Sequence, residues 1–567
     1  MSFRHLSLVL LLATSGIGGL PPRPAAAQVE RPNILIILTD DQRQMDTMQV
    51  MPRTQQWFGQ RGTTYTNAYA ATPVCCPSRA AIMTGRFNHN NGVKKNTDAH
   101  ALTQESTVQA QLQEAGYRTA LVGKYLNGWP VDGDPPYFDD WHLLIPQPDT
   151  YFGNTFNNNG TLEAEDGYST DVIRDYAIDL IESDFGGLDP EPWFMMVTPF
   201  APHHPWEAAA RHASADVGTW PGNPAVFEAD QSDKPNYVRK SKRDYARALE
   251  IREGQLRSLM AVDELVDEIL KTLEAEDEQD TLAFFLSDNG FMWAEHGLAA
   301  KSHPYAESIR IPMFARWPSH VTEGRRDDSF VANIDLAPTI LDAAGITENP
   351  SYPMDGRSLL RPNARLKMLT EGWTGARPWA SIRTRSYQYI EYYRQFDGSV
   401  RGREYYNLTA DPYQLKNYFG DRSPRNDPYP APLSREVGEA RTCVGSECTL
   451  VLERPGVASS CAGVRVKGKH HLVGSDLSDR IRGAKIRDII CGLLGDDVLR
   501  GGGGNDRLLG GEGSDVLWGG PGDDVLIGGS GHDVCIGGPG KDKFRGCERI
   551  RDKDSGKGKR GKGNKRG

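Results

Sequence analysis

The chain has 567 residues, a formal net charge of -10 and 25% charged residues. A chain of this length is expected to form several domains. Its mildly acidic balance argues against nucleic acid as the main partner, so we expect a multidomain protein with a different kind of ligand.

Residues 1–27 have the pattern of a signal peptide. A basic start is followed by the apolar run LSLVLLLATSGIGGL and by small residues ending in PAAAQ, which predicts cleavage after Ala27. The apolar run is too short to span a bilayer, and no other stretch approaches the required length. We therefore predict a secreted, extracellular protein without a membrane span.

Apolar runs alternate with helical patterns over the next 250 residues. Each run has the composition of a buried parallel strand, and apolar residues at helical spacing fall between the runs. The runs are RPNILIILTDDQ at 31–42, GYRTALVGKYLNG at 116–128, PWFMMVTPFAPHHPW at 192–206 and DTLAFFLSDNG at 280–290. The helical patterns include STVQAQLQEAG and QLRSLMAVDELVDEILKTLEAE. This alternation predicts a doubly wound α/β fold.

Polar residues follow each of these predicted strands. In open α/β sheets, ligands bind beyond the carboxyl ends of the strands. A single Asp or Asn after a strand usually caps a turn, but here four strand ends carry such groups, which favours one shared site. The residues are Asp40, Asp41, Lys124, His203, His204, Asp288 and Asn289.

Composition divides the rest of the chain. The segment EYYNLTADPYQLKNYF at 404–419 closes the α/β domain, which we place at 31–420. Residues 421–465 begin with a stretch rich in Pro and charge and are predicted to be a linker. Residues 549–567 form a basic tail of low apolar content, predicted to be disordered. The sequence leaves open whether this tail contacts a polyanion or cell surface or is simply solvated.

A nine-residue repeat begins at Gly492, within a predicted β-roll domain that we place at 466–548. Its units follow the G-G-x-G-x-D-x-U-x pattern of RTX, haemolysin-type calcium-binding repeats, which form a parallel β-roll. Glycines allow tight turns, Asp supplies oxygen ligands for Ca²⁺, and one apolar residue in fixed phase faces a narrow core. A disordered Gly-rich linker would not explain this period. The predicted calcium ligands are Asp497, Asp506, Asp515, Asp524, Asp533 and Asp542.

Six of the eight cysteines lie in the last quarter of the chain, and two lie near its start. Cys491, Cys535 and Cys547 are candidates for a disulfide within the roll, while the pairing stays open. Cys443, Cys448 and Cys461 lie before the roll, outside it. Cys75 and Cys76 stand apart, and adjacent cysteines rarely pair because the geometry is strained.

The stretch CCPSR at 75–79 resembles the C-x-P-S-R signature of the formylglycine-dependent sulfatases. The resemblance covers about residues 31–420 and implies an alkaline-phosphatase-like domain with a mixed, mostly parallel sheet sandwiched by helices. It also implies that a formylglycine-generating enzyme reads Pro77 and Arg79 and oxidises Cys75 to formylglycine. The hydrated aldehyde then attacks the sulfur, and its second hydroxyl expels sulfate.

The same resemblance implies roles for individual residues. The implied ligands of one Ca²⁺ are Asp40, Asp41, Cys75, Asp288 and Asn289. The implied catalytic set, with His203 or Lys301 as the acid for the leaving oxygen, is Cys75, Arg79, Lys124, His203 and Lys301. A hard cation suits these oxygen donors, and cations are needed around an anionic sulfate ester. His204 and His296 are further candidates.

Within the family, CCPSR, GKYLN and KSHPYAESIRIP are most similar to N-acetylglucosamine-6-sulfatases and extracellular heparan 6-O-endosulfatases. Leu126 stands where many sulfatases have a histidine, Asn289 stands where the subgroup often has one, and Ala306 replaces an acidic residue often found there. We therefore expect a calcium-dependent sulfatase acting on sulfated sugars such as N-acetylglucosamine-6-sulfate. The alternatives are a phosphonate monoester or phosphodiester hydrolase of the same superfamily, and an inert domain displayed by a calcium-binding adhesion protein.

Overall fold

The computed structural model describes residues 31–185, 191–241, 244–362, 365–373, 377–421, 427–428, 430–453, 471–473 and 478–552. The predicted signal peptide and most of the predicted basic tail lie outside these ranges. Among the described residues, no helix has the length and apolar character needed to cross a bilayer.

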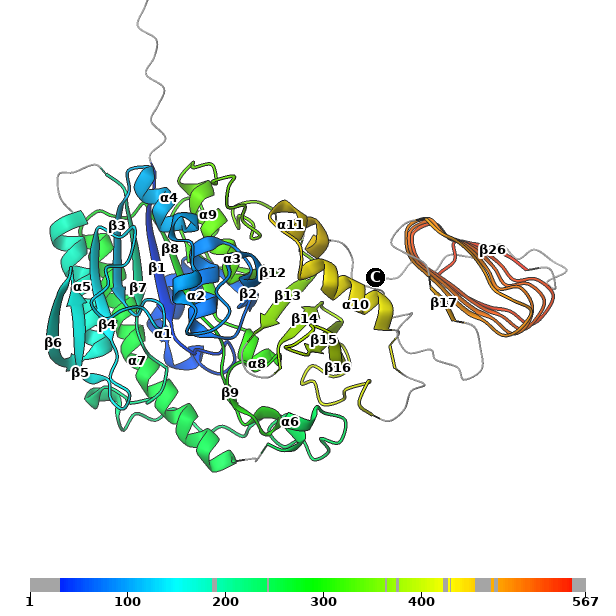
Figure 1. The fold of residues 1–567 in the computed structure, drawn as a ribbon, viewed down its shortest axis with the longest axis horizontal. Helices are drawn as coiled ribbons and strands as arrows, with labels where there is room; N and C mark the ends of the chain where they lie inside the picture. The colour runs from blue at the N-terminus through cyan, green and yellow to red at the C-terminus, as the bar shows by residue number, and fades with distance from the viewer. Residues whose placement is uncertain are drawn as a thin grey trace, which may run out of the picture. The chain divides into compact units, whose positions relative to one another are not determined.

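A ten-stranded mixed sheet forms the centre of the N-terminal domain (Figure 1). The strand order is β12-β2-β11-β8-β1-β7-β3-β4-β5-β6, and β8, β1, β7, β3 and β4 are parallel neighbours. The strands are β1 (Asn33–Thr39), β2 (Thr63–Tyr69), β3 (Arg118–Gly123), β4 (Asp140–Ile145), β5 (Phe152–Asn158), β6 (Thr161–Tyr168), β7 (Trp193–Thr198), β8 (Thr281–Ser287), β11 (Met313–Arg316) and β12 (Arg325–Ala332). The four apolar runs of the sequence are β1, β3, β7 and β8, as predicted.

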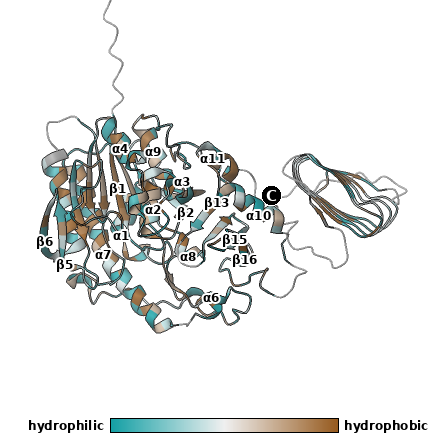
Figure 2. Ribbon diagram, viewed as in Figure 1, coloured by the Kyte–Doolittle hydropathy of each residue, from teal (hydrophilic) through white to brown (hydrophobic). Residues whose placement is uncertain are grey.

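Helices cover both faces of this sheet because successive side chains of a strand point to opposite faces. Ile34 and Ile36 of β1 pack in one core with α2, α4 and α9, and Leu35 and Ile37 pack in the other with α5 and α7. Figure 2 shows the apolar character of β1 between these layers. The helices of the domain are α1 (Pro52–Thr54), α2 (Cys75–Thr84), α3 (Asn88–Asn91), α4 (Val108–Glu114), α5 (Ser169–Asp179), α6 (Asn236–Arg239), α7 (Tyr245–Ala275), α8 (Ala306–Ile309) and α9 (Leu336–Ala343), and a short ribbon pairs β9 (Met292–Trp293) with β10 (Ala299–Ala300).

A four-stranded antiparallel sheet follows. Its strands are β13 (Met368–Gly372), β14 (Trp379–Arg383), β15 (Tyr387–Tyr393) and β16 (Val400–Asn407). Two helices, α10 (Pro430–Ala440) and α11 (Ser446–Glu453), lie within the interval predicted as a linker. Their side chains Leu433, Val437 and Leu452 are buried in the same core as β13–β15, so this part of the interval is packed structure rather than linker. Cys443 and Cys448, between and within these helices, form a disulfide.

The C-terminal repeats form two parallel five-stranded sheets. The first contains β17 (His471–Val473), β19 (Ile489–Leu494), β21 (Arg507–Glu512), β23 (Val525–Ser530) and β25 (Lys543–Arg545), and the second contains β18 (Arg480–Arg482), β20 (Val498–Arg500), β22 (Val516–Trp518), β24 (Val534–Ile536) and β26 (Arg549–Arg551). Leu499 pairs with Leu517 in register, so two nine-residue units make each coil. The buried core contains Leu499, Leu508, Leu517 and Leu526, as predicted for a β-roll. Cys535 and Cys547 form a disulfide at its end.

Candidate active site

Asp40 lies at the centre of a buried cluster at the carboxyl edge of the sheet. It directly follows β1, and its side chain is fully buried. The Cys75 thiol donates to its Oδ1 at 3.3 Å, and the Arg79 guanidinium lies 3.2 Å from its Oδ2. Lys124, which directly follows β3, forms an ion pair with the same Oδ2. Three segments far apart in the sequence therefore meet at one carboxylate.

Asp41 is the second acid after β1, and its backbone adopts a left-handed conformation with φ 69°. Such a conformation is unfavourable for a residue with a side chain and persists where the surroundings hold it. Its carboxylate is paired with Lys301, and Asn289 Nδ2 donates to its Oδ1 at 2.6 Å. The strained backbone thus turns this carboxylate toward the same cluster that contains Asp40.

Asp288 and Asn289 directly follow β8 and approach from the neighbouring strand. Asp288 Oδ2 accepts from Arg79 Nε at 3.0 Å, and its Oδ1 accepts from the backbone N–H of Asp41 at 3.1 Å. Gly290 comes next, and a Cβ there would lie 2.2 Å from the carbonyl oxygen of Glu307. Only glycine therefore allows the backbone after β8 to lie this close to the backbone at Glu307.

The first residue of α2 is Cys75, so its sulfur lies at a helix N-terminus. The unpaired N–H groups and the helix dipole favour negative charge at this end. Lys301 Nζ donates to Cys75 Sγ at 2.6 Å. The buried Cys76, by contrast, is held through its backbone N–H, which donates to Asn96 Oδ1 at 3.1 Å. The structure therefore separates the two cysteines, placing Cys75 among the charged groups of the cluster.

Electrostatics divide the buried carboxylates. Burial alone would raise the pKa of Asp40, but the charges of Lys124 and the other nearby cations hold its pKa well below the usual range. Burial raises the pKa of Asp288, and the charge of Asp40 raises it further. Burial and the charge of Asp40 also raise the pKa of the Cys75 thiol. An unmodified thiol here is therefore a poor nucleophile at neutral pH, because thiolate is the reactive form.

The donor set fits a hard divalent cation. One ligand atom each from Asp40, Asp41, Cys75 and Asp288 lies within 4.8 Å of the others. The side-chain carbonyl oxygen of Asn289 is buried and has no hydrogen-bond partner in the described part of the chain. A buried oxygen without a partner is costly, and a cation would satisfy it. Carboxylate and amide oxygens are the ligands that Ca²⁺ prefers.

His203 lies at the rim of this cluster. Its Nε2 is 3.7 Å from Asp41 Oδ2, and 27% of its side chain is exposed. His204 is exposed and packs edge-on against Trp206. His296 is buried and paired through Nδ1 with Glu228 at 2.9 Å. Of the three histidine candidates, only His203 contacts the group formed by Asp40 and Asp41.

Comparison with family models agrees with this geometry. Residues 32–346 match the sulfatase model, and 294–427 match the C-terminal model of N-sulphoglucosamine sulphohydrolase. The chain belongs to the sulfatase family. It is a sulfuric ester hydrolase by that membership, and its alkaline-phosphatase-like α/β fold is confirmed. Residues 473–508, 482–517 and 509–544 match the RTX calcium-binding nonapeptide repeat, which confirms the nature of the repeats.

Individual relatives give the same result. The sulfatase is 31% identical to human N-acetylglucosamine-6-sulfatase, covering 73% of this chain and 86% of the relative. It is 32% identical to the Caenorhabditis elegans extracellular sulfatase Sulf-1 homologue, of which it spans about half, 51%. A solved structure in complex with its substrate D-glucosamine-2-N,6-O-disulfate is 26% identical, with a TM-score of 0.62, over 72% of this chain and 97% of that chain.

Three supporting residues of the sulfatase were not predicted as site residues, although Ser78 belongs to the CCPSR motif. Ser78 donates to the backbone carbonyl of Asp288, and Asn333 donates to Ser78 Oγ at 2.8 Å. Gln255, buried within α7, donates to the backbone carbonyls of Asp41 at 3.5 Å and Pro202 at 3.3 Å. Asn333 and Gln255 are lone polar residues without a distinctive local pattern, and the tertiary structure shows the contacts that all three make with the site.

The β-roll of the sulfatase presents a second set of buried carboxylates. Oδ1 of Asp497 accepts from the backbone N–H of Asp479 at 2.7 Å, one coil earlier, and the pattern recurs every nine residues along the stack. Among the residues that the structure describes, the buried Oδ2 atoms without a hydrogen-bond partner include those of Asp497, Asp506, Asp515, Asp524 and Asp533. Burial raises the pKa of Asp497 to about 7. A column of such oxygens suits bound cations.

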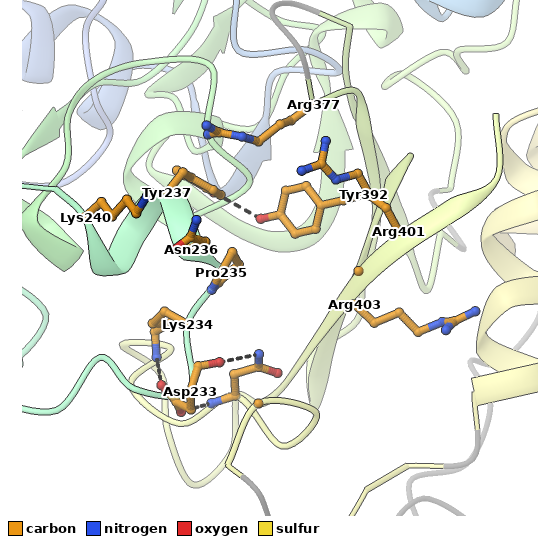
Figure 3. A pocket seen from close by; sticks show the side chains of 13 residues that line it. Asp233, Lys234, Pro235, Asn236, Tyr237, Lys240, Arg377, Tyr392, Arg401 and Arg403 are labelled. Carbon is orange, nitrogen blue, oxygen red and sulfur yellow. Dashed lines mark hydrogen bonds and ion pairs between the residues drawn. The ribbon is translucent and has the colours of Figure 1, made fainter. Parts of the chain in front are cut away.

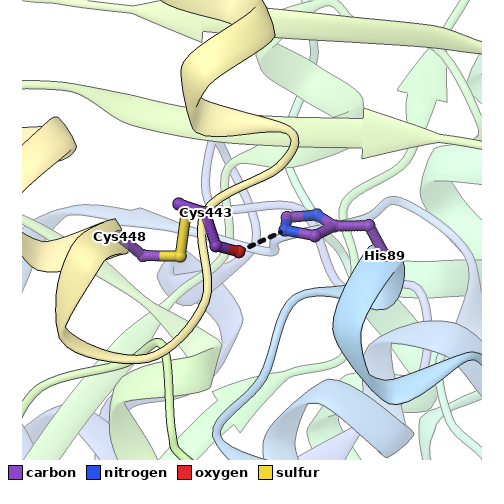
Figure 4. A group of neighbouring side chains, drawn as sticks. All are labelled: His89, Cys443 and Cys448. Atoms are coloured by element: carbon purple, nitrogen blue, oxygen red, sulfur yellow. Dashed lines mark hydrogen bonds between the residues drawn. A yellow bond between two sulfur atoms is a disulfide. The ribbon is translucent and has the colours of Figure 1, made fainter.

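One further cluster of potential metal ligands combines His89, Cys443 and Cys448 (Figure 4). The two sulfurs are joined in a disulfide and so cannot act as thiolate ligands. His89 Nε2 instead contacts the backbone carbonyl of Cys443 at 3.1 Å, and its Nδ1 contacts Glu371 Oε2 at 2.9 Å. This cluster is a structural contact between α3, the four-stranded antiparallel sheet and the loop after α10.

Proposed function

We propose that this sulfatase is exported, requires calcium, and hydrolyses 6-O-sulfate esters of glucosamine-type sugars at a formylglycine formed from Cys75. The observation that carries the proposal is the convergence of Asp40 and Lys301 on the sulfur of Cys75. That position is the one where the C-x-P-S-R signature requires the modified residue. Burial and the charge of Asp40 raise the pKa of the Cys75 thiol, which supports an oxygen nucleophile in its place.

The proposed reaction requires a calcium ion and the conversion of Cys75 to formylglycine. Ca²⁺ held by Asp40, Asp41, Asp288 and Asn289 would neutralise the carboxylates and draw negative charge from the sulfate ester. Formylglycine at position 75 would supply, as its hydrate, the oxygen nucleophile and a second hydroxyl through which sulfate can depart. Side chains of the described residues would bind the sulfate group and protonate the leaving oxygen.

Cationic side chains would bind the sulfate oxygens. Lys124 and Arg79 lie on one side of Asp40, and Lys301 lies beside the atom that Cys75 presents. Charges fixed before the substrate arrives stabilise the negative charge that develops in the transition state, at little cost in reorganisation. Burial alone would lower the pKa of Lys301, but the charge of Asp41 raises it well above its usual value, so this ammonium remains charged.

His203 would donate the proton to the leaving sugar oxygen. It stands at the open side of the cluster and is partly exposed, whereas Lys301 has only 15% of its side chain exposed and contacts the nucleophile position. A general acid must reach the leaving atom, which faces the solvent-accessible side of the site. The structure therefore favours His203 over Lys301 for this role.

The substrate class rests on the relatives. Human N-acetylglucosamine-6-sulfatase carries this specificity in its name, and the solved relative was captured with a 6-O-sulfated glucosamine. Calcium would also fill the column of Asp oxygens in the β-roll, so a second, structural requirement for calcium is part of the proposal. Extracellular relatives and the RTX repeats support export.

The test is peptide mass spectrometry across residues 72–86 of the protein purified from its native producer, together with turnover assays. We expect the aldehyde or its hydrate at position 75, and release of sulfate from N-acetylglucosamine-6-sulfate. An aryl phosphonate and a phosphodiester serve as comparison substrates. An unmodified thiol would overturn the mechanism in favour of an inert binding protein, and faster turnover of the phosphonate would reassign the substrate.

A further inference from the structure

A cationic pocket of about 730 Å³ lies outside the cluster around Asp40 (Figure 3). It is formed by the segment around α6, the start of β16, the end of β15 and the loop before β14. The lining residues are Asp233, Lys234, Pro235, Asn236, Tyr237, Lys240, Arg377, Tyr392, Arg401, Gly402, Arg403, Asn417 and Gly420. Its volume is in the range of ligand-binding cavities.

Two of the cations in this pocket are already neutralised. Lys234 Nζ pairs with Glu228 Oε1 at 2.8 Å, and Arg403 Nε pairs with Glu391 Oε1 at 3.3 Å. Asp233, the one acid among the lining residues, accepts from the backbone N–H of Asn417 at 2.6 Å and lies 3.3 Å from Lys234 Nζ. These groups build the wall and contribute little net charge.

Other cations of the pocket remain available to a ligand. Lys240 and Arg377 are exposed. Among the described residues, neither Lys240 nor Arg377 forms an ion pair with a carboxylate. Arg377 is instead held over the ring of Tyr237 at 4.6 Å, which orders its guanidinium without neutralising it. The pocket therefore offers fixed positive charge and a planar fork of donors suited to sulfate or carboxylate.

Two contacts link the pocket wall to the loop that carries Lys301. Tyr237 stacks on His303, with ring centroids 5.7 Å apart and an interplanar angle of 10°. His303 lies two residues after Lys301, so the two Cα atoms are at most about 7.6 Å apart. The Trp379 indole donates to the carbonyl of Ser302 at 3.2 Å, which ties the loop between them to β14. The pocket wall therefore packs against the loop that carries Lys301.

We propose that this pocket binds the anionic group of the sugar unit next to the one that loses its sulfate, with Arg377 as the main contact. The inference rests on the proposed function and extends it from a single sugar to an acidic oligosaccharide. The volume leaves room for a neighbouring sugar, and the positive charge selects a neighbour that carries sulfate or carboxylate. The pocket thereby sets a preference for sulfated acidic polysaccharide over monosaccharide.

The experiment compares kcat/KM for four 6-O-sulfated glucosamine substrates. Two are monosaccharides, with N-acetyl or N-sulfate groups, and two are disaccharides whose second unit is neutral or is a uronate. We expect the native enzyme to prefer the acidic disaccharide by about tenfold or more, the effect of one charge-assisted contact. We expect Arg377→Gln to remove that preference and leave the N-acetyl monosaccharide unchanged.

The control is Arg61→Gln. Arg61 also rests on an aromatic ring, with its guanidinium carbon 4.4 Å from the ring of Trp57, but it does not line the pocket. Arg377→Lys should restore part of the preference, and raised ionic strength should reduce it. The proposal would be overturned if Arg377→Gln lowered kcat/KM equally for all four substrates. It would also be overturned if this variant lowered kcat/KM for the N-sulfated monosaccharide as much as for the acidic disaccharide. Failure of the native enzyme on every sulfate ester would instead reject the proposed function.

Discussion

Lys301 Nζ lies 2.6 Å from the Sγ of Cys75, although 226 positions separate the two residues in the chain. The contact forms because α2 begins at Cys75 while Lys301 comes from the loop after the β9–β10 ribbon. A charged ammonium at this distance would stabilise negative charge on whatever atom replaces the sulfur.

We predict that Lys301→Ala lowers kcat for sulfate ester hydrolysis by about 10²–10³, the usual effect of removing one preorganised donor from a buried site. Conversion of Cys75 should be unaffected, and mass spectrometry would check this in the same sample. Lys271→Ala, at an exposed position on α7, is the control and should change kcat little. A Lys301→Ala enzyme with native kcat would contradict the assignment.

Asn289→Ala should raise the calcium concentration needed for activity. Its buried carbonyl oxygen has no partner in the described structure, so its loss removes one ligand while Asp40, Asp41 and Asp288 remain. The measurement is sulfatase activity against free calcium after treatment with a chelator. The β-roll should respond to calcium as in the native chain, and this can be followed by circular dichroism. A parallel shift in both responses would argue against a separate site.

Asp497→Asn should weaken calcium binding by the β-roll several-fold while leaving the active-site requirement unchanged. The amide keeps the acceptor for the N–H of Asp479 but removes the charge that a cation would meet. Asp496→Asn is a matched control because Asp496 is adjacent and exposed. Calcium titrations of both variants would decide. Equal affinity in the two would show that the buried carboxylate is not a ligand.

His89→Gln should cost stability mainly at acid pH. Burial alone would lower the pKa of His89, but the hydrogen bond from its ring to Glu371 outweighs burial and raises the pKa above 6.5. The stabilisation is therefore full below pH 6.5 and disappears as pH rises through the raised value. We expect the free energy of unfolding to fall by about 1.5–3 kcal/mol at pH 5.5, the effect of a hydrogen bond to a charged group, and by less at pH 8.5.

His142→Gln provides the opposite control for that measurement. Burial lowers the pKa of His142, which stacks on Tyr176 with ring centroids 4.0 Å apart. Its neutral form is favoured in the folded state, so its contribution is present above pH 6.5 and declines as pH falls. Denaturant unfolding at several pH values would compare the two variants. The same pH trend in both would contradict these assignments.

Much of the site could be predicted because its residues directly follow strands. Apolar runs end at Thr39, Gly123 and Ser287, and parallel strands bring such ends to one edge. The supporting role of Gln255 could not be predicted, because a single polar residue inside a long helix has no distinctive local pattern. The helix α10 was hidden by prolines that suggested a linker. Its spacing of Leu433, Val437 and Ala440 nevertheless has a helical period.

The cationic pocket could not have been predicted for a different reason. Tyr237 and Arg377 are 140 positions apart and belong to different parts of the domain. Their contact depends on how the C-terminal sheet packs against α6, which no spacing in the sequence records. The repeats are the opposite case, because a period of nine residues dictates the register of every coil.

Each coil of the β-roll pairs only with the coils next to it. The stability of the stack is therefore approximately a sum of the stabilities of single coils and of the interfaces between neighbouring coils. Such a stack opens from its ends, where each unit has a single neighbour. The disulfide between Cys535 and Cys547 closes the C-terminal end. Local unfolding should therefore begin at the N-terminal coils and proceed toward the disulfide. Amide hydrogen exchange should be slower in β24 than in β18, and reduction of the disulfide should abolish that gradient.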